Sequence, residues 1–151
     1  MKVLLYRGRS IISRGIQLQT RSKYSHAAVM LDDRTVIEAW HKGGVRRLDS
    51  PFDGHSEKTL IDVYKVDDTY YPEIVEDFLK QQIGKKYDFR SVLRFMTRIK
   101  AKDNDKWFCS ELVVEAFRRG GIDLLKGPAG MLSPRDLGIS PHLTKLDTMG
   151  K

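Results

Sequence analysis

The chain has 151 residues, of which 40% are hydrophobic and 31% are charged. These proportions are ordinary for a globular protein and exclude disordered, collagen-like and low-complexity chains. The length suits one domain with a sizeable core, so residues 1–151 are predicted to form a single domain. The 27 lysines and arginines exceed the 20 acidic residues and give a net charge of +7, which bears on partners rather than on fold.

No segment of the sequence has the properties of a membrane span or a secretory signal. The apolar run Val3–Tyr6 is far shorter than the roughly 7–15 residues of a signal-peptide core or the ~20 residues of a transmembrane helix. We therefore expect a cytoplasmic protein without a transmembrane segment. The single cysteine, Cys109, excludes an internal disulfide and any multi-cysteine zinc or iron–sulfur site.

Strands are predicted to dominate the first half of the chain. Apolar and β-branched runs predict strands over residues 2–7, 25–31, 35–40, 45–49 and 59–66. The second and third of these strands form a predicted β-hairpin, and residues 25–66 together form an antiparallel meander. A short helix is expected over residues 11–19, with Ser10 as its N-cap.

The second half of the chain is predicted to be mainly helical. Apolar residues at helical spacing predict helices over residues 72–84, 88–100 and 107–119. Residues 126–151 contain several glycines and prolines, and we expect them to be irregular apart from about one helical turn. The predicted fold class is α+β, with a small antiparallel sheet from residues 25–66 packed against helices.

Cys109 is the first candidate for chemistry. It falls in the first turn of the helix predicted over residues 107–119, where unpaired N–H groups and the helix dipole favour a thiolate and would lower the thiol pKa. A thiolate attacks carbonyl carbon. The alternative is that Cys109 is a small buried hydrophobic residue, which is common for a free cysteine.

His26 and Glu38 are stronger site candidates together than either residue is alone. Glu38 lies between apolar residues inside a predicted strand, where a carboxylate is costly to bury without a partner. If the hairpin loop has three residues, 32–34, both side chains point to the same face as diagonal neighbours within reach of a hydrogen bond. A carboxylate behind a histidine fixes its tautomer and supports the imidazolium. A two-residue loop would break this relationship. Taken singly, His26 could be a core residue or an exposed strand end, and Glu38 a solvent-facing residue on a half-exposed strand.

Four sequence stretches, YSHAAVML, VIEAW, GKKYDF and FCSELVVEAF, occur in this order over roughly residues 5–118. They resemble the permuted branch of the NlpC-type papain-like cysteine hydrolases, which is related to lecithin:retinol acyltransferase-like proteins. In the unpermuted branch the cysteine helix precedes the histidine strand, whereas here the histidine comes first. The resemblance implies a circularly permuted papain-like fold.

The resemblance also implies roles for individual residues. Cys109 would be the nucleophile, His26 the general base and Glu38 the group that orients the histidine. Tyr87 matches the family tyrosine that helps to hold the oxyanion, together with the backbone N–H of Cys109. Glu111 would have a structural role such as capping. The implied activity is that of a cysteine hydrolase or acyltransferase that cleaves an amide or ester bond of a small-molecule, peptide or lipid substrate.

No cofactor and no metal site is expected from the sequence. The other histidines form no H-x-x-x-H pair. His41 follows Trp40 at a predicted strand end and is expected at the surface, His55 lies in a loop with Asp53 and Glu57, and His142 follows Pro141 near the end of the sequence.

Basic residues suggest a second kind of partner. Arg90, Arg94 and Arg98 recur every four residues along a predicted helix, and we call them the basic band. Such a stripe is often only a solvated face, but it would also attract an anionic surface such as phospholipid or a cell-wall polymer. The alternative to an enzyme is therefore a non-enzymatic basic module that binds nucleic acid or anionic membrane. No signature of a specific nucleic-acid-binding module is present.

Overall fold

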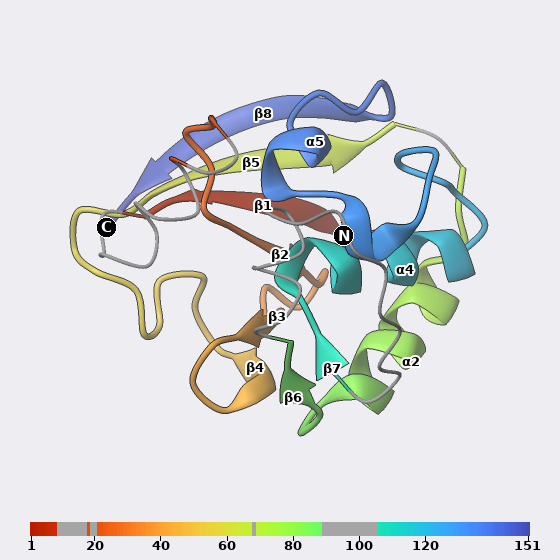
Figure 1. Cartoon of the computed structure of the whole chain (residues 1–151), viewed down its shortest axis with the longest axis horizontal. Helices are drawn as coiled ribbons and strands as arrows, with labels where there is room; N and C mark the ends of the chain where they lie inside the picture. The colour runs from red at the N-terminus through yellow and green to blue at the C-terminus, as the bar shows by residue number, and fades with distance from the viewer. Residues whose placement is uncertain (9–17, 19–20, 68, 89–105) are drawn as a thin grey trace.

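A computed structural model describes residues 1–8, 18, 21–67, 69–88 and 106–151 (Figure 1). The helix predicted over residues 11–19 and the helix predicted over residues 88–100, with its basic band, fall almost entirely outside these ranges. Within the described residues, no helix is long and apolar enough to cross a membrane.

The centre of the molecule is a six-stranded antiparallel sheet with the order β4-β3-β2-β1-β5-β8 (Figure 1). The strands are β1 (Lys2–Arg7), β2 (His26–Met30), β3 (Val36–Trp40), β4 (Gly44–Leu48), β5 (Leu60–Val66) and β8 (Leu143–Gly150). The α+β class is confirmed, and so are the five strands predicted in the first half of the chain. Two features of the predicted sheet are wrong.

The first error is that the sheet extends beyond residues 25–66. β1 lies inside it and separates β2 from β5, so β5 pairs with β1 and not with β4. Leu4 and Leu5, which point to opposite faces, are both fully buried. A strand that is apolar on both faces suits the interior of a sheet covered on both sides, which explains the position of β1.

The second error concerns the C-terminal segment, which was expected to be irregular. Residues 143–150 form the edge strand β8, and most of its side chains are exposed. An edge strand with so little burial shows no clear alternation of apolar and polar residues, so its sequence gives little indication of a strand. The pairing with β5 supplies the structure that the local sequence does not indicate.

Between β2 and β3, Leu31 and Thr35 close a three-residue turn of residues 32–34, as the hairpin prediction requires. The backbone N–H of Leu31 donates to the carbonyl of Thr35 at 2.8 Å, and Arg34 adopts a positive φ of 70° in the turn. In the ladder, Val29 pairs with Ile37. This register places the even-numbered residues of both strands on one face of the sheet.

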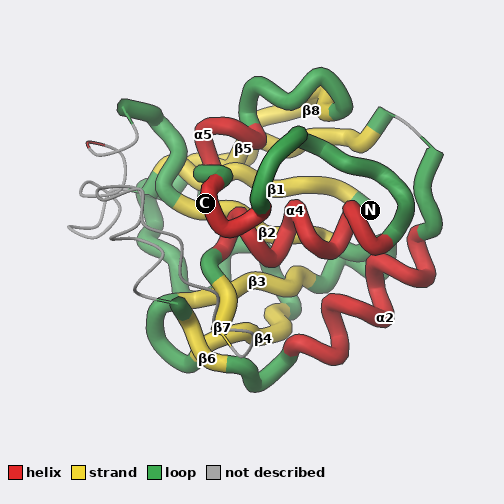
Figure 2. Tube along the Cα trace, turned by 45° about the vertical axis from the view of Figure 1, so that its right-hand side comes forward, coloured by secondary structure: helices red, strands yellow, loops and turns green. Residues whose placement is uncertain are grey.

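Helices cover the opposite, odd-numbered face. The helices are α2 (Pro72–Gln82), α4 (Cys109–Arg119) and α5 (Pro134–Leu137), with a 3-10 turn, η1 (Ala129–Met131). Figure 2 shows α2 and α4 lying in front of the sheet. Leu112, Val113 and Phe117 of α4 are buried against Val29 and Ile37 of the sheet in the larger hydrophobic core. The helices predicted over 72–84 and 107–119 are confirmed within two residues at each end.

A small parallel ladder leads into α4. β6 (Lys86–Tyr87) pairs with β7 (Lys106–Trp107), so α4 begins at Cys109 and not at residue 107. The backbone N–H of Val45 in β4 donates to the carbonyl of Lys85 at 2.8 Å, which attaches β6 to the main sheet. Gly44 permits this contact, because a Cβ there would lie 2.0 Å from that carbonyl oxygen.

A second, smaller core lies on the even-numbered face. It contains Leu4, Tyr6, Ala28, Val36, Ile61 and Val63. Phe52, from the segment that joins β4 to β5, packs against this cluster. The hydroxyl of Tyr6 donates to the carbonyl of Pro51 at 3.0 Å and holds that segment on the sheet.

Asp62 links three strands of the sheet through a buried carboxylate. It bonds to the guanidinium of Arg7 in β1 and to the Thr148 hydroxyl (2.6 Å) and the Lys145 ammonium (3.0 Å) in β8. The hydroxyl of Tyr24 also donates to it at 2.7 Å. Burial would raise the pKa of Asp62, but these hydrogen bonds, that of Arg7 first, hold it well below its ordinary value.

Candidate active site

His26 and Glu38 form a buried hydrogen-bonded pair on the even-numbered face. Nε2 of His26 lies 2.6 Å from Oε2 of Glu38, and the two side chains are 8% and 0% exposed. The sequence placed both residues on one face within reach of a hydrogen bond, and this relationship is confirmed. Strand β4 supplies a further partner for the carboxylate, because Arg46 of β4 lies opposite Glu38 of β3.

The carboxylate of Glu38 accepts hydrogen bonds on both oxygens. Arg46 donates to Oε1 from Nε at 2.9 Å and from Nη2 at 2.6 Å, and Nε2 of His55 lies 3.2 Å from Oε2. Burial by itself would raise the pKa of Glu38, but the charges and hydrogen bonds of His26 and His55 bring it well below its ordinary value. Glu38 is therefore an ionised acceptor at neutral pH.

Aromatic rings enclose this cluster. The Tyr6 ring contacts His26 at 5.0 Å between centroids and stacks on His55 at 4.4 Å. Trp40 contacts the same two imidazoles at 5.2 Å and 4.7 Å, and the guanidinium of Arg46 lies 4.9 Å from the Trp40 ring. Rings that pack on both histidines restrict their rotation and exclude water from the carboxylate.

The hydrogen bond to Glu38 determines which nitrogen of His26 carries a proton. An ionised carboxylate only accepts, so Nε2 of His26 must donate, and Nδ1 of the neutral ring is left unprotonated. Burial lowers the pKa of His26, although the negative charge of Glu38 opposes this shift. In its neutral form the ring therefore presents Nδ1 as the nitrogen able to accept a proton.

Cys109 lies where β2 and β3 stop pairing. The ladder between these strands ends at Val29 and Ile37, and α4 packs against both strands. Nearer the start of β2, where β3 no longer pairs with it, the backbone of Ala27 hydrogen-bonds to the thiol of Cys109. The thiol is thus next to the residue that follows His26, at the opening between the two strands.

The thiol pKa differs from the sequence-based expectation. Burial raises the pKa of Cys109 to about 12, although backbone hydrogen bonds from Ala27 and Ser110 act in the opposite direction. Cys109 is only 1% exposed. The prediction that the helix start lowers the thiol pKa is therefore wrong for the resting protein. Burial disfavours the thiolate more strongly than the nearby N–H groups stabilise it.

The pairing of nucleophile and base stays a prediction. In the part of the chain that the structure describes, no hydrogen bond joins the Cys109 thiol to His26. Catalytic hydrogen bonds often tighten only when substrate binds, so the predicted pair is compatible with a structure without substrate. The structure places the Cys109 thiol beside Ala27, the residue after His26, and pairs Tyr87 with Trp107, two residues before Cys109.

Tyr87 is brought close to Cys109 by the β6–β7 ladder. It pairs with Trp107, and the Asp88 N–H that follows donates to the Trp107 carbonyl at 3.0 Å. Its ring contacts Phe108 at 6.0 Å. Burial raises the pKa of Tyr87 far above its ordinary value, and the charge of the Cys109 thiolate raises it further, so the hydroxyl remains a proton donor.

The residues around the start of α4 hold Cys109 in place. The Phe108 N–H donates to the carboxylate of Glu111 at 3.3 Å, which confirms the predicted capping role of Glu111. The Ser110 hydroxyl donates to the carbonyl of Leu132 at 2.5 Å and ties α4 to the segment after η1. The first turn is therefore fixed on both sides of the cysteine.

His55 and Arg46 are the site residues that the sequence did not identify. The sequence placed His55 only in a loop, whereas its side chain is 5% exposed and bonds to Glu38. It comes from a turn-rich segment without periodicity, so no local pattern indicates its orientation. Arg46 could have been identified from the sequence. Pairing the predicted strand at residues 45–49 with the strand that carries Glu38 places Arg46 opposite Glu38.

His26, Glu38 and His55 also have the chemistry of a metal site. Their ligand atoms lie within 4.8 Å of one another, and two imidazoles with one carboxylate are donors that zinc accepts. In the structure these atoms are hydrogen-bonded to each other, and Arg46 already balances the charge of Glu38. A cation would have to replace both N–H protons, so the cluster is complete as a hydrogen-bonded network.

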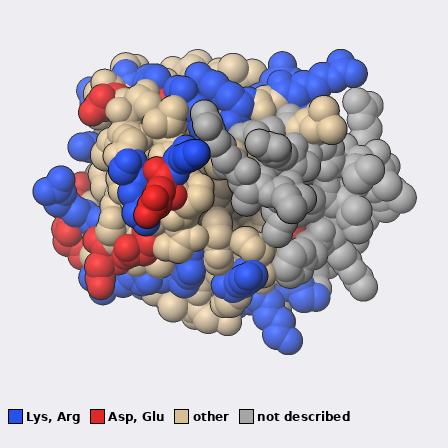
Figure 3. Space-filling model, turned by 90° about the vertical axis from the view of Figure 1, so that its left-hand side faces the viewer, with Lys and Arg blue, Asp and Glu red and all other residues tan. Residues whose placement is uncertain are grey.

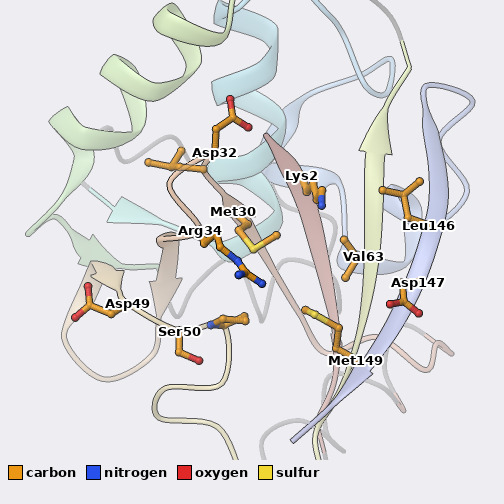
Figure 4. Close-up of a pocket in the computed structure, with 12 residues that line it drawn as sticks. Lys2, Met30, Asp32, Arg34, Asp49, Ser50, Val63, Leu146, Asp147 and Met149 are labelled. Carbon is orange, nitrogen blue, oxygen red and sulfur yellow. The ribbon is translucent and has the colours of Figure 1, made fainter.

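A pocket of about 540 Å³ lies elsewhere on the even-numbered face, between the segment after β4 and strand β8 (Figure 4). Its lining includes Lys2, Met30, Arg34, Ser50, Asp147 and Met149. None of the four predicted site residues lines it. On the face seen in Figure 3, lysines and arginines among the described residues are interspersed with acidic side chains and form no single patch.

The sequence of this chain matches a known protein family. A family model described as "Permuted papain-like amidase enzyme, YaeF/YiiX, C92 family" matches residues 2–127, a range that includes all four predicted site residues. The chain belongs to this family. Membership supports a cysteine-type hydrolase at the level of the family, and it confirms the permuted papain-like resemblance.

Two Escherichia coli proteins illustrate the relationship. The "Probable lipoprotein peptidase YaeF" of strain K12 is 26% identical over an alignment that covers 84% of this chain but only 58% of that protein. The chain thus spans less than two thirds of the length of this curated relative. The crystal structure of "metalloprotein yiiX" from strain O157:H7 matches with a TM-score of 0.72 and 23% identity, covering 99% of this chain and 97% of that one. This second likeness establishes the fold.

Proposed function

We propose that the protein is a cysteine amidase or esterase that acts through an acyl-cysteine intermediate, with Cys109, His26 and Glu38 as nucleophile, base and orienting group. The observation that carries the proposal is the buried 2.6 Å hydrogen bond between His26 and Glu38, on strands that adjoin the start of the cysteine helix. The same three residues are those that the family resemblance implies.

The first step forms the intermediate. Because the resting thiol is protonated, attack is coupled to proton transfer from Sγ of Cys109 to the free ring nitrogen of His26. A bond forms between Sγ and the carbonyl carbon, and the carbonyl oxygen becomes an oxyanion. The Tyr87 hydroxyl and the Cys109 N–H would donate to this oxygen, while Glu38 stabilises the imidazolium.

The second step releases both products. His26 returns its proton to the leaving amine or alcohol, and the bond between carbon and leaving group breaks. Water, deprotonated by His26, then attacks the acyl-cysteine and regenerates the thiol. A different nucleophile in place of water would give an acyl transfer by the same sequence.

The test uses p-nitrophenyl acetate as a general acyl donor. We expect release of p-nitrophenolate by the wild-type protein, and intact-mass detection of an acetyl group on Cys109. Cys109→Ala and His26→Ala should each abolish both signals, whereas His142→Ala serves as a matched control outside the site. Equal hydrolysis by wild type and Cys109→Ala would refute the proposal.

Chelation separates a thiol mechanism from a metal mechanism, since the structural relative yiiX is described as a metalloprotein. Activity that survives EDTA and disappears on alkylation of Cys109 supports the thiol as nucleophile. Loss of activity in EDTA, with recovery on adding zinc, would instead assign the cluster of His26, Glu38 and His55 to a metal-dependent hydrolase.

A further inference from the structure

His55 shares a carboxylate oxygen with the predicted catalytic base. Its Nε2 lies 3.2 Å from Oε2 of Glu38, the same oxygen that His26 contacts at 2.6 Å. Because the ionised carboxylate only accepts, both histidines present an Nε2 proton to it. The oxygen is held between two donors, and Arg46 holds the other oxygen of Glu38.

The His55 ring has little freedom to leave this position. It stacks on Tyr6 with an interplanar angle of 23° and makes a T-shaped contact with Trp40 at 4.7 Å between ring centroids. The main chain that carries it is also fixed, because the Tyr6 hydroxyl donates to the carbonyl of Pro51. The neighbouring Gly54 has a φ of 75°, and a Cβ there would lie 2.8 Å from Nη2 of Arg46.

The segment between β4 and β5 therefore closes over Glu38 and supplies a donor at a defined place. We propose that His55 is a positioning residue, which holds the Glu38 carboxylate so that His26 keeps its Nε2 proton on Glu38 and its Nδ1 free to accept a proton. This inference rests on the proposed function for its catalytic consequence, but its structural part is independent of any reaction. The alternative is that His55 only fills space between Tyr6 and Trp40.

Two substitutions separate these roles. His55→Phe keeps a flat ring that can stack on Tyr6 but has no N–H to donate. His55→Gln loses the ring, but its amide can donate from nearly the position of the imidazole Nε2. A donor role predicts that the Gln variant resembles wild type and the Phe variant does not, whereas a packing role predicts the reverse.

The structural readout is the NMR signal of the His26 Nε2 proton in protein with 15N-labelled histidine. In wild type and in His55→Gln we expect a strongly deshielded, slowly exchanging proton, because the hydrogen bond to Glu38 is short. In His55→Phe this signal should shift upfield or vanish through exchange with water. An unchanged signal in His55→Phe, with thermal unfolding that shows the variant is folded, would overturn the proposal.

The kinetic readout is hydrolysis of p-nitrophenyl acetate. Loss of one hydrogen bond to a charged group should lower kcat roughly 10- to 100-fold in His55→Phe. KM should change by less than about twofold, since His55 does not contact the acyl donor in this proposal. His55→Gln should recover most of kcat. Near wild-type kcat in His55→Phe together with a loss in His55→Gln would indicate packing and overturn the proposal. If wild type lacks Cys109-dependent hydrolysis, the proposed function fails, and the NMR signal still decides the role of His55.

Discussion

Nε2 of His26 lies 2.6 Å from Oε2 of Glu38, although the residues belong to different strands. Their contact depends on the length of the loop between these strands. With three residues in the loop, both side chains point to the same face, and one residue fewer would send one of them to the helix-covered face. The position of the pair on the sheet is therefore set locally, whereas its environment is set by β1, β4 and the segment that carries His55.

Replacing Glu38 by Gln should be costly for both stability and activity. The amide nitrogen of the new side chain would face the Nε2 protons of two histidines, or else replace the oxygen that Arg46 contacts. Breaking a buried ion pair from one side typically costs about 3–5 kcal/mol in free energy of unfolding. Urea unfolding measures this loss, and Glu115→Gln, which removes only exposed pairs with Arg118 and Arg119, should cost less than about 1 kcal/mol. Similar values for the two variants would contradict the buried network.

Asp62→Asn should change how stability depends on pH. The pKa of Asp62 is held below its ordinary value in the folded protein, so its stabilising contribution is complete above about pH 5 and is lost as pH falls toward the folded pKa. We expect the variant to be less stable than wild type by about 3–5 kcal/mol at pH 7. This gap should narrow between pH 5 and pH 2 in urea titrations. A constant gap over that range would show that the charge of Asp62 is not the cause.

Tyr87→Phe tests the predicted oxyanion donor. Removal of one such donor typically lowers kcat roughly 10²- to 10³-fold, since the hydrogen bond strengthens as charge develops on the oxygen. The measurement is p-nitrophenyl acetate hydrolysis. Tyr70→Phe, a partly buried tyrosine that contacts Phe117 in the main core, is the matched control and should retain activity. Equal activity of the two variants would remove Tyr87 from the mechanism.

The basic band, whose arginines lie outside the described residues, remains a prediction from sequence. We expect salt-dependent binding to anionic phospholipid vesicles that Cys109→Ala retains. Simultaneous replacement of Arg90, Arg94 and Arg98 by Gln should remove most of the salt dependence, because fewer counterions are released. Vesicle sedimentation at low and physiological salt measures both effects. Unchanged binding by the triple variant would identify the band as a solvated face.

Several features of the site follow from local sequence alone. Alternation along residues 25–31 and 35–40 and turn residues between them fix the hairpin and its register, and hence the shared face of His26 and Glu38. An apolar helical stripe that ends at a double glycine fixes α4, and hence the place of Cys109 near its start. Both depend on residues close together in the chain, where periodicity is informative.

Tertiary structure decided the rest, because burial and strand pairing depend on residues far apart in the sequence. His55 reaches Glu38 only because the segment between β4 and β5 folds back over β1 and is held by Tyr6. The thiol of Cys109 has a raised pKa because the sheet and α4 bury it more than the helix start can offset. Strand β8 exists because β5 offers it an edge, since its own side chains are mostly exposed. In each case the stabilising free energy comes from contacts between residues far apart in the chain, which the local sequence pattern does not reveal.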